Sequence, residues 1–149
     1  MKKAGIILII ILIAIQFIRP DKNESGYESL AAFEQETQMP AAVKQVMQNN
    51  CYDCHSQQTT YPWYAQVAPI SLWLNHHIEE GQEHLNLAQW ASWDHKKKDH
   101  KLDELIEEVE EAEMPLKSYT WIHGTLSEAE KELLINWAKS TRSALSTAH

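Results

Sequence analysis

The only two cysteines of this chain stand three positions apart, in the sequence CYDCH at residues 51–55, and a histidine follows the second. The chain contains 2 Cys and 8 His among 149 residues. Random placement gives this spacing roughly once in 75 trials and a following histidine roughly once in 19, so coincidence has odds on the order of one in a thousand. We therefore expect a chemical reason for the arrangement.

A Cys-x-x-Cys-His motif is the pattern of c-type haem attachment. Each thiol can add across a vinyl group of the porphyrin to form a thioether, and the adjacent imidazole then lies beneath the ring within reach of iron. The motif predicts one covalently bound haem c, attached through Cys51 and Cys54, with His55 as the proximal iron ligand.

Three other interpretations of the motif remain open. The cysteines can form a plain disulfide, or a thioredoxin-like redox pair, although such a pair normally follows a strand and begins a helix. A zinc site needs a fourth ligand besides Cys51, Cys54 and His55 and gives no reason for the histidine to follow the second cysteine directly.

Met114 is the best candidate for the sixth iron ligand. It follows an acidic helical segment and precedes Pro115, and a residue before proline is displaced from helical geometry, so the helix must end there. Met47 belongs to a helical stripe and is expected in the core, and Met39 lies at the start of the helix that leads to the motif. Some other histidine, or an open site, remains an alternative; the histidines considered are His76, His77 and His123.

The N-terminal residues 1–20 have the composition of a signal anchor or a signal peptide. Residues 4–18 are apolar except for Gln16 and are flanked by basic residues at 2, 3 and 19. A helix of this length reaches about 22 Å, less than the roughly 30 Å hydrocarbon layer, which favours a removable signal. No small-x-small cleavage triplet follows, which favours a retained anchor. The N-terminal lysines predict an inner-membrane anchor with the rest of the chain facing the periplasm.

The charge balance restricts the partners. The chain carries 21 acidic and 13 basic residues, and three of the basic ones lie within residues 1–20. Such a surface repels phosphate backbones, so we expect no nucleic-acid partner and instead a redox partner protein with a basic docking face. The local exception HKKKDHK, at 95–101, is expected to be a solvated loop or the start of a helix.

The hydrophobic pattern predicts a mostly α fold with a polar tether at 21–38 and a domain at 39–149. Helices are expected from Pro40 to Cys51, from Ile70 to Glu80 with Gly81 as the stop, briefly in NLAQWASW, and across 102–109. Ser127 and Glu130 form a capping-box pattern that opens a last helix. The expected inward residues are Val43, Val46, Met47, Leu72, Trp73, Ile78, Trp90, Trp93, Leu102, Leu105, Ile106, Val109, Leu133, Leu134, Trp137 and Ala138.

The stretches NNCYDCHSQQTTYPWYAQVAPISLWLNHHIEEGQEHLNLAQW and EMPLKSYTWIHGTLSEAEKELLINWA resemble the bacterial haem-binding-domain family of exported cytochrome c-like proteins, over roughly residues 40–140. The resemblance implies a class I cytochrome c-like helical domain around one covalently attached haem, with Met114 as distal ligand. It also implies that the carbonyl of Pro69, or less favourably Pro62, accepts the hydrogen bond from His55. The segment before Met114 is long and rich in His and Trp, which departs from a strict class I layout.

These expectations favour an electron carrier of the cell envelope over an enzyme. The alternatives are a haem-based sensor with an exchangeable sixth site and a peroxidase-like enzyme. The second alternative lacks support in the sequence, because the chain has only two arginines, Arg19 and Arg142, and neither is near a motif.

Overall fold

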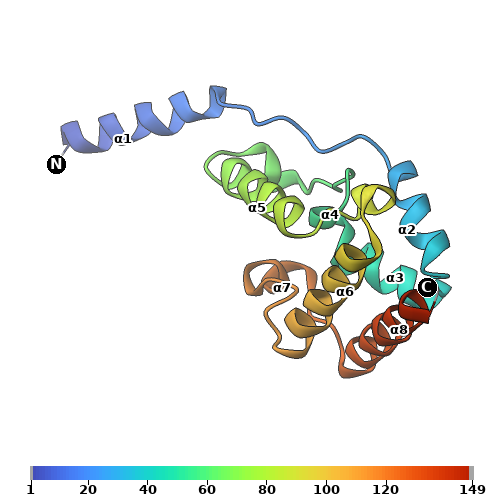
Figure 1. Cartoon of the computed structure of the whole chain (residues 1–149). Helices are drawn as coiled ribbons and strands as arrows, with labels where there is room; N and C mark the ends of the chain where they lie inside the picture. The colour runs from blue at the N-terminus through green and yellow to red at the C-terminus, as the bar shows by residue number, and fades with distance from the viewer. Residues whose placement is uncertain (1, 148–149) are drawn as a thin grey trace.

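The computed structural model describes residues 2–147 and is built from helices and connecting loops (Figure 1). Over these residues the α-helices are α1 (Lys2–Ala14), α2 (Ala31–Glu36), α3 (Ala41–Asn50), α4 (Tyr52–His55), α5 (Ile70–His84), α6 (His95–Glu110), α7 (Lys117–His123) and α8 (Glu128–Thr147). Short 3₁₀ helices are η1 (Ile15–Phe17), η2 (Glu28–Leu30), η3 (Trp63–Gln66) and η4 (Leu87–Ser92). The mostly α fold class is confirmed, and the expected ranges 1–20 and 39–149 extend beyond the described part at residues 1 and 148–149.

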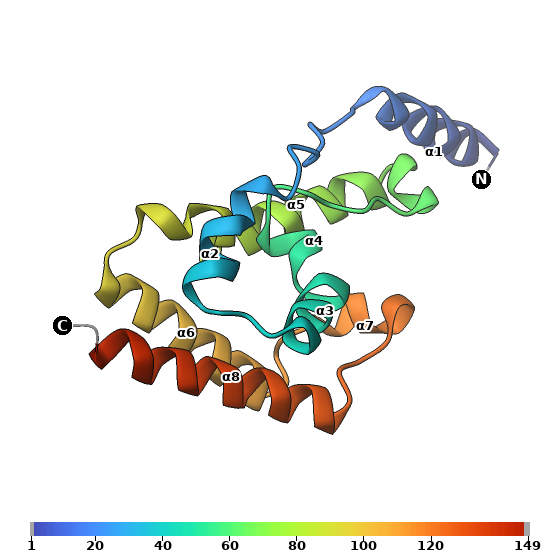
Figure 2. The same ribbon diagram turned by 90° about the vertical axis from the view of Figure 1, so that its right-hand side faces the viewer.

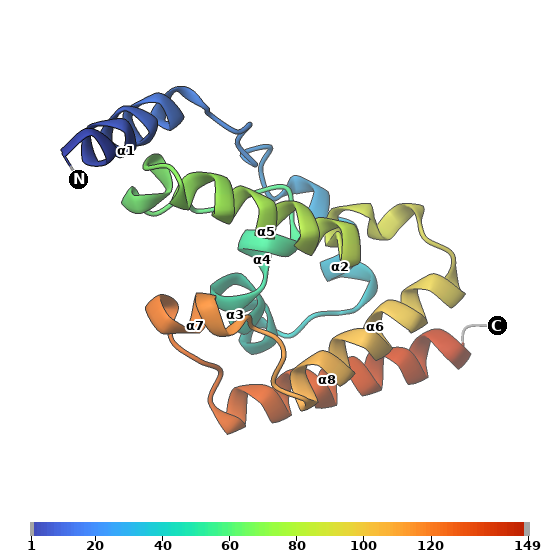
Figure 3. The same cartoon turned by 90° about the vertical axis from the view of Figure 1, so that its left-hand side faces the viewer.

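The long helices α6 and α8 lie side by side and close one side of the domain (Figures 2 and 3). Their apolar stripes face each other and the core, as the periodicity predicts. On these two helices the expected inward residues are buried except Leu133, which is 37% exposed, so the expectation for Leu133 is wrong. The buried ones are Leu102, Leu105, Ile106, Val109, Leu134, Trp137 and Ala138.

Side-chain caps begin both of these helices. Before α8, the Glu130 carboxylate accepts the Ser127 backbone N–H (2.8 Å) and the Ser127 hydroxyl accepts the Glu130 N–H (3.3 Å), which is the predicted capping box. Before α6, Asp94 accepts the Lys97 N–H at 2.8 Å. The basic stretch 95–101 therefore forms the start of a helix, and its Lys98 is buried in an ion pair with Glu36 at 2.7 Å.

The expected polar tether at 21–38 is wrong, because this segment is part of the domain. Phe33 is fully buried, with its ring centroid 4.9 Å from that of Trp90 and 5.9 Å from that of Trp137. Leu30 is 1% exposed. The few apolar residues of the segment are too sparse to form a periodic stripe, yet they enter the core that α8 and η4 complete.

Helix α5 continues one turn beyond the expected stop at Gly81 and ends at His84. Gly81 does not adopt a left-handed C-cap conformation, since it lies within the helix. Ile78 is buried as expected, whereas Trp73 is 47% exposed, so its assignment to the core is wrong.

The apolar N-terminal segment forms α1 and η1, which project from one end of the domain (Figure 1). Within residues 2–147, no helix is both long enough and apolar enough to cross a bilayer. The junction with the domain is fixed by Gln16, whose side-chain amide donates to the Ala68 carbonyl (2.8 Å) and accepts from the Ala68 N–H (3.0 Å).

The chain contains only two phenylalanines, and they give a matched test of whether 21–38 is part of the core. Replacing the fully buried Phe33 with Ala should lower the free energy of unfolding by about 3–5 kcal/mol, because it leaves a cavity between two tryptophans. Phe17 is 83% exposed, so Phe17→Ala should change it by less than about 0.5 kcal/mol. Denaturant unfolding in detergent solution measures both; equal, small effects would restore the tether interpretation.

Candidate functional site

The one-turn helix α4 carries Cys54 and His55, directly after α3. The Cys51 N–H donates to the Met47 carbonyl at 2.9 Å and ends α3, and the Cys51 carbonyl accepts the His55 N–H at 2.9 Å and holds α4. Both cysteines are free thiols. The motif thus lies at the end of α3, as the periodicity predicts.

The His55 ring is oriented by two carbonyls from the end of α5. Its Nδ1 lies 2.8 Å from the Leu85 oxygen and 3.0 Å from the Gly81 oxygen, so Nδ1 carries the proton and Nε2 keeps its lone pair. Burial lowers the pKa of His55, and these two hydrogen bonds only partly oppose that effect. A neutral imidazole with a free Nε2 is the form that ligates a metal.

The proline carbonyls expected to orient His55 are engaged elsewhere. The Pro69 oxygen accepts the Trp73 N–H (3.1 Å) in the first turn of α5, and the Pro62 oxygen accepts the Ala65 N–H (3.0 Å) in η3. The assignment of Pro69, or Pro62, as the partner of His55 is wrong, because the His55 Nδ1 instead faces the Leu85 and Gly81 oxygens at the end of α5.

Gly81 permits the close contact between α5 and α4. A Cβ atom at this position would lie 3.1 Å from the Cys54 Cβ and 3.2 Å from the Cys54 carbonyl oxygen. The missing side chain brings the helix backbone near enough for the Gly81 carbonyl to reach the His55 ring.

The residues after the motif are tied down by the N-terminal segment and by α5. The Ser56 carbonyl accepts hydrogen bonds from the side chains of Asn23 (3.0 Å) and Gln82 (2.7 Å). The Asp53 carboxylate accepts the Thr60 N–H at 2.8 Å. Residues on both sides of the motif therefore hold α4 in place.

Two adjoining cavities bring the predicted ligands together. They measure about 380 Å³ and 250 Å³, and His55, His84 and Met114 line both. Cys51 lies in the wall of the larger cavity and Cys54 in that of the smaller. Their combined space is in the range of cofactor pockets. Of the predicted site residues, only Pro69 lies outside these walls.

Met114 reaches this position because α6 ends at Glu110. Its N–H donates to the Glu108 carbonyl at 3.1 Å, in the turn that leads from α6 to α7. The sequence predicted that this helix must end before Pro115, and the structure places Met114 in the turn that follows it.

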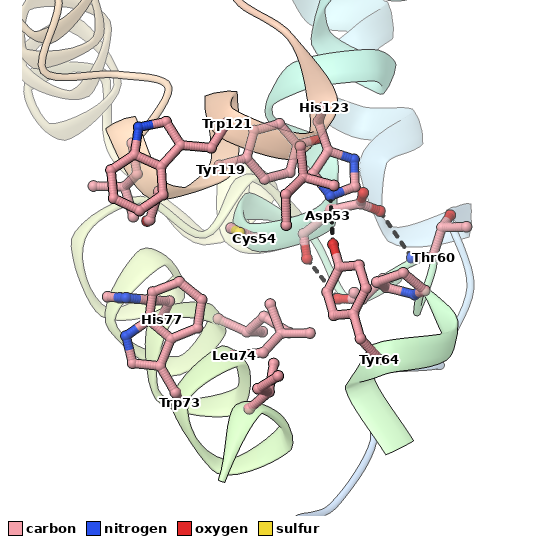
Figure 4. Close-up of a pocket in the computed structure, with 17 residues that line it drawn as sticks. Asp53, Cys54, Thr60, Tyr64, Trp73, Leu74, His77, Tyr119, Trp121 and His123 are labelled. Atoms are coloured by element: carbon pink, nitrogen blue, oxygen red, sulfur yellow. Dashed lines mark hydrogen bonds between the residues drawn. The ribbon is translucent and has the colours of Figure 1, made fainter. Parts of the chain in front are cut away.

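A third cavity of about 460 Å³ lies between α5, α7 and the η3 loop (Figure 4). It shares Cys54, His77, Leu116 and Tyr119 with the smaller of the other two. Trp73 on α5 and Trp121 on α7 lie across it from one another in Figure 4. The Tyr64 hydroxyl and the His123 Nε2 are 2.9 Å apart at its edge.

Four other histidines bear on the site. His76 is exposed and lies 3.4 Å from Glu80, so it is a surface residue. His77 and His123 line the third cavity. His84, which the sequence reasoning missed, lines both cavities with His55. A signal was present, since His77, Gly81 and His84 are spaced by four and three residues and so share one helix face.

The thiols do not have the properties of a redox-active pair. Burial raises the pKa of Cys51 to about 12 and that of Cys54 to about 11. Reactive Cys-x-x-Cys pairs have lowered values instead. Within residues 2–147, no group of three or more His, Cys, Asp or Glu side chains is arranged to hold a metal ion, so the zinc interpretation finds no ligand set there.

Comparison with known proteins agrees with this geometry. Residues 10–140 match the model of the family described as the Haem-binding domain, and the chain belongs to this family. The family assignment implies a haem cofactor. No curated protein and no solved structure matches the chain.

The Gly81 contact can be tested by adding one methyl group. Gly81→Ala gains up to about 1 kcal/mol of helix propensity, but overpacking against a backbone typically costs about 1–3 kcal/mol. Because the Cys54 carbonyl cannot rotate away, we expect a net loss of about 1 kcal/mol in the free energy of unfolding of the apoprotein. Glu83→Ala, at an exposed site on the same helix, is the control for propensity alone. A stabilised Gly81→Ala protein would refute the close-contact argument.

Proposed function

We propose that this haem-binding-domain protein is a c-type cytochrome that carries single electrons. The observation that supports it best is the convergence of two thiols, one oriented imidazole and one thioether on two adjoining cavities. In this proposal Cys51 and Cys54 attach the haem covalently, His55 is the proximal ligand and Met114 the distal ligand. The haem supplies the one-electron redox chemistry.

The walls of these two cavities fit a haem, which has an apolar ring and charged propionates at its edge. Met47, Leu105, Val109 and Leu134 line the larger cavity and exclude water from it. Within the part of the chain that the structure describes, Lys101 is the one lysine or arginine in the walls of the two cavities, and it pairs with Glu104 at 2.6 Å. Its ammonium group is the natural partner for a haem propionate.

Electron transfer is favoured over catalysis by the positions of the arginines. Arg142 pairs with Asp99 and Asp103 between α8 and α6, and Arg19 donates to the Gln66 carbonyl at 2.6 Å. Neither lines the two cavities that contain His55. A peroxidase-like role therefore lacks an arginine at the site. A sensor role requires an exchangeable sixth ligand, which the Met114 experiment below decides.

We further propose that the chain is held at the inner membrane by α1, with the domain in the periplasm, and that its redox partner presents a basic face. The acidic residues Glu104, Glu107 and Glu108 lie in the wall of the Cys51 cavity, at the surface of α6. Complementary charge at this edge would steer a basic partner toward the haem.

Covalent attachment predicts the outcome of extraction. Haem should stay with the wild-type polypeptide through acid–acetone treatment, after expression with cytochrome maturation machinery. In a Cys51→Ser, Cys54→Ser double variant all covalently bound haem should be lost, since no thioether can form, while each single variant keeps one link. Haem staining after denaturing electrophoresis measures this. Retention of haem by the double variant would contradict c-type attachment.

Substitution of a methionine that precedes a proline tests the distal ligand. The chain has two such residues, Met114 and Met39. Met114→Ala should abolish the weak far-red band of methionine-ligated ferric haem and lower the reduction potential by on the order of 0.1 V, because methionine ligation raises it. Carbon monoxide should then bind the reduced variant. Met39→Ala is the matched control, since Met39 precedes Pro40 and contacts Tyr52 (3.6 Å) instead.

If Met114→Ala leaves both properties unchanged, Met114 is not the ligand. His84→Ala is then the next variant, because His84 lines the same two cavities. Carbon monoxide binding by the unmodified protein would instead support the sensor alternative.

A further inference from the structure

Exposed large apolar side chains gather at one end of the domain. Trp121 is 84% exposed, Trp63 81% and Ile122 65%. Ile70 and Trp73, which line the third cavity, and Val67, which ends η3, are also exposed. So are Phe17 and Ile18, which follow Gln16 at its hydrogen bonds to Ala68. Elsewhere in the domain, among the residues the structure describes, only Tyr27 and Leu133 are large, apolar and exposed. A patch of this kind marks an interaction surface.

This end of the domain is the one from which α1 projects. Figures 2 and 3 both show α1, the η3 loop with the start of α5, and α7 at the same end of the molecule, while α2 and the C-terminal part of α8 lie away from it. The apolar patch therefore continues the apolar surface of α1.

Hydrogen bonds fix the distance between α1 and the patch. Gln16, in the turn that follows α1, exchanges two hydrogen bonds with the Ala68 backbone, and Arg19 donates to the Gln66 carbonyl. Ala68 and Gln66 lie between Trp63 and Ile70. Because of these hydrogen bonds, the η3 loop lies beside the C-terminal end of α1 in any position that α1 takes up in a membrane.

Apart from Arg19, a cation beside the η3 loop, the patch is also free of charge in a strongly acidic protein. No Asp, Glu, Lys or Arg occurs between Asp53 and Glu79, or between Lys117 and Glu128, although the chain has a formal net charge of −8. Anionic headgroups would repel the acidic surfaces elsewhere, whereas this end presents tryptophan, isoleucine and uncharged polar groups. That composition is typical of segments at a membrane–water interface.

We propose that this end of the domain, the bilayer face formed by Phe17, Trp63, Val67, Ile70, Trp121 and Ile122, rests in the headgroup layer of the membrane that holds α1. The inference rests on the membrane attachment proposed above. The 13 residues of α1 rise about 20 Å, so its end cannot stand clear of a hydrocarbon layer roughly 30 Å thick. The η3 loop is thereby brought to the interface, and the haem is held at a fixed angle to the membrane.

Linear dichroism of the full-length haem protein tests this orientation. In oriented multilayers of phosphatidylethanolamine and phosphatidylglycerol, the Soret band should absorb light polarised parallel and perpendicular to the membrane unequally. Trp63→Ser with Trp121→Ser should abolish that difference while α1 keeps the protein in the lipid. A second variant, Trp63→Ser with Val67→Ser, changes no residue that lines one of the three cavities. It should also lose the difference between the two polarisations. Leu133→Ser, an exposed apolar site on α8, is the control and should keep the difference.

A second readout does not need haem. Tryptophan emission of the apoprotein, in vesicles of the same lipids with brominated acyl chains, should be quenched in the wild type and in Leu133→Ser and quenched less in the Trp63, Trp121 variant. If the protein shows no Soret band, the haem proposal is refuted, but the quenching experiment on the apoprotein still tests the bilayer face. The bilayer face is refuted if the protein does not stay with the lipid, if the wild type shows no orientation, or if the double variants behave as the wild type.

Discussion

The contact between the His55 ring and the last turn of α5 sets the geometry of the whole site. The final carbonyls of a helix lack partners within it and carry the negative end of its dipole. Here the Gly81 oxygen accepts the Leu85 N–H at 2.9 Å and, with the Leu85 oxygen, faces the His55 Nδ1. The last carbonyls of α5, which would otherwise need water, thus fix the tautomer of His55 and the direction of its Nε2. They also raise the basicity of Nε2 toward a metal ion.

The N-terminal segment supports the same contact from the opposite side. Asn23 binds the Ser56 carbonyl and the Thr59 hydroxyl, and its own N–H donates to the Tyr61 hydroxyl at 2.8 Å. A few residues later Phe33 completes the core between Trp90 and Trp137. One continuous stretch therefore connects α1, the loop after the motif and the core.

Local chemistry made the motif, the amphipathic helices and the Met114 turn predictable. Periodicity locates α3, α6 and α8, and Pro115 dictates where α6 must end. The errors all concern long-range contacts. In a sequence, a glycine that ends a helix cannot be distinguished from one that, like Gly81, lies within a helix and allows another backbone to pack closely against it. The sparse apolar residues of 21–38 are buried only because distant helices provide the cavity. Pro69 loses its predicted role because the far end of α5, not its start, packs against His55.

The two ends of the site face different surroundings. The Cys51 cavity opens beside the glutamates of α6, whereas Cys54 lies where the smaller cavity meets the third one, in whose wall Asp53 is the one charged residue among those the structure describes, next to the proposed bilayer face. The basic protein partner proposed above would be attracted to the first side, where the acidic residues are more numerous than on the second. If the bilayer covers the η3 and α7 end, electrons enter or leave past α6, on the side that water and soluble partners reach. The acidity of α6 and the neutrality of residues 54–78 then serve one arrangement: both direct the partner to the Cys51 edge of the haem.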